Sequence, residues 1–253
     1  MSRSSRLSIF GVAAIAVSLL APGLASANHS WGGYHWARTA NPFTLKLGDN
    51  VTSAWDGYLS TTSSDWSASS VLNTAIVAGG SKGRNCRATT GRVEVCNGAY
   101  GSNGWLGIAS ISITGGIHIT KGTVRLNDTY FNTAAYNSPA WRNLVMCQEV
   151  GHTFGLDHQD ENFNNANLGT CMDYTNDPSS NQHPNAHDYA QLETIYAHLD
   201  STTTVGAATP GGSGAADAND WGQLVRTSPD GHLATYLKDL GAGQLIVTFV
   251  IWA

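Results

Sequence analysis

The segment from Ser138 to His158 limits most strictly how this chain can fold. It opens with Ser138-Pro139, and serine at the cap followed by proline at the first helical position is a strong helix start. Gly155 ends the helical pattern after about four turns. The apolar positions between these signals recur at helical spacing and are Ala140, Leu144, Val145, Val150 and Phe154. The sequence therefore predicts one long helix that ends in a sharp turn.

Side chains on this helix are arranged so that they can hold a metal ion. Gln148 and His152 are four residues apart, so they project from one face and can reach one point. Glu149 is the residue after Gln148, and its carboxylate can contact a water molecule at that point. Because Gly155 permits a sharp turn, His158 can return to the same place. Two imidazoles and a third ligand leave an open position for water, as in a catalytic zinc site.

This pattern resembles the metzincin zinc proteases, which include the matrixins and the astacins. Their helix motif is His-Glu-x-x-His-x-x-Gly-x-x-His, followed by a tight turn that contains methionine. The chain matches the motif at Glu149, His152, Gly155 and His158. The segment Cys171-Met172-Asp173-Tyr174 follows at a fitting distance and resembles the methionine turn, or Met-turn.

The resemblance implies a secreted zinc-dependent endopeptidase that hydrolyses peptide bonds with a metal-activated water. It implies that His152 and His158 bind one catalytic Zn²⁺, that Glu149 is the general base, and that Met172 lies beneath the metal. Tyr174 resembles the tyrosine with which astacins stabilise the transition state, although plain packing is an equally good interpretation of this residue. Such an enzyme takes a peptide or protein as its substrate.

The chain departs from the family at the first position of the motif, where Gln148 replaces histidine. A glutamine oxygen can bind zinc but is a weaker donor than imidazole. Three interpretations follow: Gln148 is the third ligand; His118, His183 or His187 takes that place; or the site is metal-free and the protein is a catalytically inactive binding module. A metal-dependent amidase acting on cell-wall peptides is a further alternative.

The expected fold class is α+β, with a metzincin-like twisted mixed β-sheet, the active-site helix, the Met-turn, a C-terminal helix and a small C-terminal antiparallel β meander. The expected divisions are a signal peptide at 1–27, a catalytic domain at 28–200, a linker or loop at 201–220 and a β appendage at 221–253. By residue pattern, strands are expected at 43–47, 71–77, 105–113, 117–126, 221–227, 232–238 and 245–252, and further helices at 51–59 and 186–199. Asn50 is the expected cap of the first helix, and the resemblance aligns 117–126 with the substrate-binding edge strand.

The N-terminus and the cysteines indicate export to an oxidising compartment. A basic start, an apolar run and Ala25-Ser26-Ala27 are typical of a secretory signal peptide. The four cysteines form an even set with three possible pairings, of which the sequential one is simplest: Cys86 with Cys96, and Cys147 with Cys171. The second bridge would clamp the active-site helix to the Met-turn and contribute about 3 kcal/mol. We expect a secreted, extracellular protein.

Charge limits the class of partner. The formal net charge is −5 and only 12% of residues are charged, which argues against nucleic acid or an anionic membrane as the main partner. After signal cleavage we expect no membrane association, and we expect a monomer. The acidic residues Asp157, Asp160 and Glu161 are interpreted as a solvated stretch, with a structural Ca²⁺ left open. The remaining histidines, treated as surface residues, are His29, His35, His198 and His232.

Overall fold

The computed structural model describes residues 29–81, 83–206 and 220–253. The predicted signal peptide at 1–27 and residues 207–219 of the expected linker lie outside the described residues. The strands are β1 (His35–Trp36), β2 (Phe43–Asn50), β3 (Leu72–Ala78), β4 (Val93–Gly98), β5 (Trp105–Thr114), β6 (His118–Asn127), β7 (Gln223–Thr227), β8 (Leu233–Gly241) and β9 (Gln244–Trp252). The helices are α1 (Asp56–Trp66), α2 (Asp128–Phe131), α3 (Pro139–His152) and α4 (Ala186–Ile195), with short 3₁₀ turns at Gly83–Asn85 and Pro178–Ser180.

These strands form one mixed sheet in the order β3-β2-β4-β6-β5-β9-β8-β7, and β1 pairs with β6. The pairs β2–β3, β2–β4, β4–β6 and β1–β6 are parallel, whereas β5–β6, β5–β9, β8–β9 and β7–β8 are antiparallel. The expected mixed sheet with few helices is therefore confirmed. The three C-terminal strands are antiparallel, as expected, and they continue the main sheet through β9.

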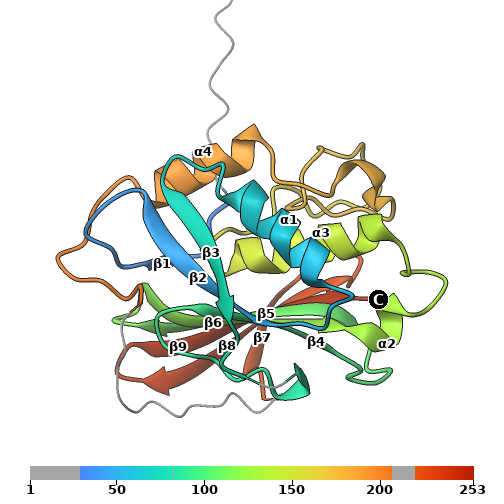
Figure 1. Ribbon diagram of the computed structural model, residues 1–253, viewed down its shortest axis with the longest axis horizontal. Helices are drawn as coiled ribbons and strands as arrows, with labels where there is room; N and C mark the ends of the chain where they lie inside the picture. The colour runs from blue at the N-terminus through green and yellow to red at the C-terminus, as the bar shows by residue number, and fades with distance from the viewer. Residues whose placement is uncertain (1–28, 82, 207–219) are drawn as a thin grey trace, which may run out of the picture.

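Helices α1, α3 and α4 lie on the same side of the sheet in Figure 1. The sequence alternation explains which side of a strand faces them, because on β2 the side chains of Phe43, Leu45 and Leu47 are buried while Thr44 and Lys46 are exposed. The buried strand residues pack with apolar residues of α3 into one large core. This core fixes α3 against β5 and β6 and so determines where its C-terminal end lies.

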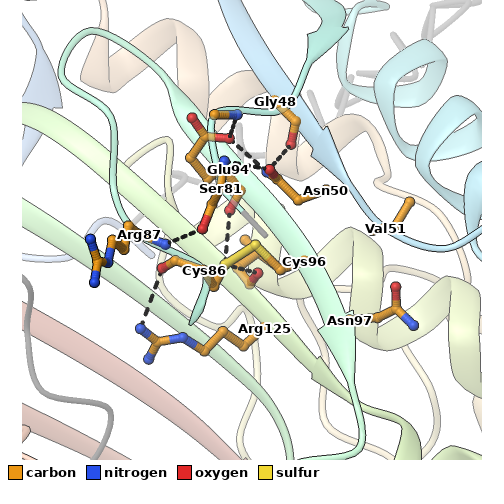
Figure 2. Close-up of a disulfide and its surroundings, with 12 residues drawn as sticks. Gly48, Asn50, Val51, Ser81, Cys86, Arg87, Glu94, Cys96, Asn97 and Arg125 are labelled. Atoms are coloured by element: carbon orange, nitrogen blue, oxygen red, sulfur yellow. Dashed lines mark hydrogen bonds between the residues drawn. A yellow bond between two sulfur atoms is a disulfide. The ribbon is translucent and has the colours of Figure 1, made fainter. Parts of the chain in front are cut away.

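The disulfide Cys86–Cys96 joins the loop before β4 to that strand, with 5.8 Å between the two Cα atoms. Figure 2 shows its surroundings, in which Arg125 of β6 donates to the carbonyl oxygen of Cys86. The neighbouring Glu94 is fully buried, forms an ion pair with Arg92 at 2.6 Å, and accepts a hydrogen bond from Asn50 at 2.6 Å. The predicted pairing of these cysteines is confirmed.

Two local predictions were wrong. The first helix starts at Asp56, not at Val51, and its cap position is Trp55. Asn50 instead belongs to β2, where its side-chain amide binds the Gly48 carbonyl and the Glu94 carboxylate. The segment 117–126 is also no edge strand, because β6 lies between β4 and β5 in the sheet. Within the described ranges, no helix is long and apolar enough to cross a membrane.

Candidate metal centre

Local signals in the sequence set the position of α3. The Ser138 hydroxyl accepts a hydrogen bond from the Trp141 amide at 3.2 Å, and Pro139 occupies the first helical position. The helix ends at His152, and Gly155 then adopts φ +94°, which side chains rarely tolerate. A Cβ atom at Gly155 would also lie 2.0 Å from the carbonyl oxygen of Tyr34. Only glycine fits here, so this turn fixes the direction in which the chain returns towards His158.

Replacement of Gly155 by alanine is expected to destabilise the protein by about 2 kcal/mol or more, because a positive φ and a backbone clash act together. The expected loss in melting temperature is at least about 5 °C for a chain of this size, measured by thermal unfolding. Gly33→Ala is the matched control, since Gly33 has φ +73° but nothing within 4 Å of the added Cβ atom. An equal loss in both variants would contradict the importance of the clash.

His152 and His158 meet at the end of α3. Their Nε2 atoms lie 3.0 Å apart, and both side chains are almost fully buried. The Nδ1 atom of His152 lies 2.9 Å from the carbonyl oxygen of Leu156, which can only accept, so Nδ1 carries the hydrogen. Burial and the neighbouring His158 lower the pKa of His152 to about 3. His152 is therefore neutral at pH 7, and its Nε2 presents a bare lone pair to His158.

The ring of His158 is oriented in the same way, with Nδ1 facing other groups and Nε2 facing His152. The Nδ1 atom of His158 faces the carboxylates of Asp157 at 3.4 Å and Glu161 at 3.8 Å, which favours a hydrogen on that nitrogen. The two Nε2 atoms lie within hydrogen-bond distance, so without a metal ion one ring can donate its N–H to the other. Zinc–nitrogen bonds of about 2.0–2.1 Å in a tetrahedral site place two nitrogens about 3.3 Å apart, close to the observed spacing. The pair therefore fits a shared zinc ion.

Gln148 lies one helical turn before His152 and is fully buried. Its Nε2 atom donates to the carbonyl oxygen of Cys171 at 2.9 Å, and this fixes which end of the amide is the oxygen. The Oε1 atom is buried and has no hydrogen-bond partner among the described residues. A buried amide oxygen without a partner is costly in a folded protein. Its donor type and its place on the helix suit a third metal ligand.

Glu149 and Tyr174 present two more buried polar atoms to this region. Within the described part of the chain, neither Oε2 of Glu149 nor the hydroxyl of Tyr174 has a hydrogen-bond partner. Burial raises the pKa of Glu149 well above its ordinary value, although the backbone amide of Ala109 opposes this shift. Burial, with the nearby Glu149 charge, raises the pKa of Tyr174 as well. The Tyr174 ring stacks on His158 with 4.4 Å between ring centroids.

The segment Cys171–Tyr174, which resembles a Met-turn, is tied to α3 and α4. Cys147 and Cys171 form the predicted second disulfide, with a Cα–Cα distance of 5.9 Å. Met172 lies beneath the helix, because a Cβ atom added at Gly151 would meet its sulfur at 2.7 Å. Thr170 donates to the buried Asp188 of α4 and accepts from the Met172 amide at 3.0 Å. Thr170 and Asp188 position the turn, and neither belongs to a motif that the sequence displays.

The alternative third ligands lie elsewhere. His118 contacts Asp200 at 3.1 Å, His183 contacts Asp65 at 2.7 Å, and the ring of His187 stacks on that of His29. None of these contacts involves His152 or His158. Of the four side chains considered for the third position, Gln148 is the one that lies on α3 with His152.

Several residues expected at the surface are buried. His29 and His35 are only 4% and 2% exposed, because each binds a backbone carbonyl through its ring, at Asp157 and Gly33 respectively. The expectation for Asp157 was also wrong, since it is 9% exposed and pairs with Arg226 at 2.5 Å. Burial alone would raise the pKa of Asp157, but hydrogen bonds and charge from His158 and the charge of Arg226 hold it below its usual range.

The C-terminal strands cover the site. The ring of Phe249 in β9 stacks on His152 with 4.3 Å between centroids and an interplanar angle of 4°. Arg226 of β7 forms ion pairs with Asp157 and Glu161, which flank His158. β9 also occupies the side of β5 that β6 leaves free. A cavity of about 580 Å³ lies nearby, between the loop from Asp160 to Asn164 and the turn at Pro229 and Asp230. An extended substrate cannot reach the histidines in this form.

Comparison of the sequence with protein-family models gives no match, and comparison with curated proteins gives none either.

Proposed function

We propose that this protein is a secreted zinc-dependent endopeptidase of the metzincin type, with Gln148, His152 and His158 as its metal ligands. The observation that carries the proposal is the 3.0 Å approach of the His152 and His158 Nε2 atoms. The unpartnered oxygen of Gln148 on the same helix supplies a third donor. The order of sheet, helix, glycine turn, Met-turn and later helix supports the same family, and the two disulfides suit an oxidising compartment.

Each side chain has a role that its surroundings support. A zinc ion held by these ligands would supply a Lewis acid that polarises a peptide carbonyl and makes a water molecule more acidic. Glu149 lies three residues before His152 on α3, and one of its carboxyl oxygens has no hydrogen-bond partner among the described residues. Burial raises its pKa, and the charge of a bound zinc ion would favour the ionised form that takes the proton from the attacking water. The Tyr174 hydroxyl stays protonated at neutral pH and would donate to the oxyanion that develops on the substrate.

The closed site favours a second candidate function. A chain whose His152 lies under Phe249 and whose first motif position is glutamine fits a catalytically inactive binding module on a protease scaffold. Zinc content and chelator-sensitive cleavage of casein, measured on the purified protein, separate the two functions. An endopeptidase binds zinc and loses its activity to a chelator, whereas an inactive module shows no cleavage even when zinc is supplied.

Replacing Gln148 tests the proposed ligand set. Gln148→Ala is expected to weaken zinc binding at this site by at least about tenfold, because even the loss of an outer-shell partner has effects of this size. Gln148→His is expected to strengthen it, because imidazole is the better donor. Gln191→Ala is the control, since Gln191 is a buried glutamine of α4 that binds the His29 amide. Unchanged zinc affinity in Gln148→Ala, measured by competition with a chelator, would rule out Gln148 as a ligand.

A further inference from the structure

A second group of metal-binding side chains lies where β1 meets β6. His35 and His118 are register partners in these two strands, and His198 and Asp200 follow α4 closely. The possible ligand atoms of His35, His198 and Asp200 all lie within 4.8 Å of one another. None of these residues takes part in the centre around His152. Three segments that are far apart in sequence therefore bring imidazoles and a carboxylate together.

The distances between the donor atoms match those in a metal site. The Nε2 atoms of His35 and His198 are 3.1 Å apart. The Oδ1 atom of Asp200 lies 3.6 Å from Nε2 of His35 and 3.8 Å from Nε2 of His198. On its other side, the same oxygen lies 3.1 Å from Nε2 of His118. Donors around a tetrahedral zinc ion are separated by about 3.3 Å, so small side-chain rotations suffice.

His35 and Asp200 each make hydrogen bonds through the side-chain atom that faces away from the cluster. These bonds direct the other ring nitrogen or carboxylate oxygen towards the possible metal position. Nδ1 of His35 lies 2.8 Å from the carbonyl oxygen of Gly33, so it carries the hydrogen and Nε2 is bare in the neutral ring. Oδ2 of Asp200 accepts from the backbone amide and the Nη1 atom of Arg38, at 3.1 and 2.8 Å. This leaves Oδ1 facing the imidazoles. Outer partners of this kind are the usual support of metal ligands.

We infer that His35, His198 and Asp200 form a binding site for a divalent metal ion of the zinc class. Two imidazoles and one carboxylate are donors that zinc accepts, and they leave a fourth position for water. The ion would connect β1 to the chain that follows α4. His198 is the solvent-exposed ligand, with 54% of its side chain accessible, and provides the route of entry.

Zinc titration of the full chain tests this inference. After metal removal, the intact protein is expected to bind about two zinc ions, and His198→Ala about one, since each proposed site is built for a single ion. His198 is exposed, so its replacement should leave the fold intact. His183→Ala is the matched control, because its side chain is 55% exposed and also lies beside an aspartate, Asp65. The control is expected to bind as much zinc as the intact protein.

The rise in melting temperature on adding zinc gives a second measurement. Zinc is expected to raise the melting temperature less in His198→Ala than in the control. The inference is overturned if His198→Ala keeps both the zinc content and the zinc-dependent rise of the intact protein. Failure of the proposed peptidase centre looks different: there the intact chain binds a single zinc ion that Gln148→Ala retains and His198→Ala loses.

Discussion

Glu149→Gln is expected to lower the rate of casein hydrolysis by roughly a hundredfold to ten-thousandfold, the usual contribution of a general base. Glutamine has nearly the same shape but cannot take a proton from water. Zinc should remain bound, because Glu149 is not one of the proposed ligands. The melting temperature should stay constant or rise, since burial already raises the pKa of this carboxyl and makes its charged form costly. Hydrolysis, zinc content and thermal unfolding are measured on the same preparation.

Glu94→Gln is the control for this experiment. Glu94 is as deeply buried as Glu149, but its partners are Asn50, Gly80 and Arg92. This control is expected to lose stability, because it breaks a buried ion pair, while it keeps the activity of its folded fraction. Hydrolysis that persists in Glu149→Gln would show that another group, or a contaminating protease, is responsible.

Local signals explain which parts of the fold could be predicted from the sequence. The start of α3 is set by Ser138 and Pro139 and its end by Gly155, all within the segment itself. The two disulfides followed from simple sequential pairing. The first helix was misplaced because Asn50, a good cap in isolation, is held in β2 by Glu94, which lies 44 residues further along the chain. Tertiary contacts here outweigh a local preference.

The two candidate sites also differ in whether local sequence signals or tertiary contacts determine them. Gln148, His152 and His158 lie within eleven residues, so one helix and the glycine turn that follows it account for their positions. The cluster of His35, His198 and Asp200 forms where β1 packs against the chain that follows α4, and no spacing in the sequence predicts this contact. The burial of His35 was not predicted for the same reason. Sequence patterns reveal a site well when neighbouring residues carry it and poorly when distant segments assemble it.

The cover over the metal centre could not be predicted in this way. The segment at 245–252 was correctly expected to be a strand, but its partner could not be deduced from an apolar run. In the structure, β9 pairs with β5 and thereby places Phe249 on His152. The pairing buries Val247 and Phe249 almost completely. The proposed peptidase activity would therefore depend on how often β9 moves away from the site.

Phe249→Ala is expected to raise casein hydrolysis by on the order of 100-fold, because loss of a buried phenylalanine costs about 3 kcal/mol and makes opening of β9 easier by that amount. The rate is compared with that of Val247→Ala, which weakens the same strand and should give a smaller increase. Phe131→Ala is the matched control, since Phe131 is equally buried but packs against Trp55, away from the histidines. An equal gain in this control would mean that general unfolding, not release of β9, exposes the site. No hydrolysis in either the intact or the Phe249→Ala protein, with zinc bound, would favour the inactive binding module over the endopeptidase.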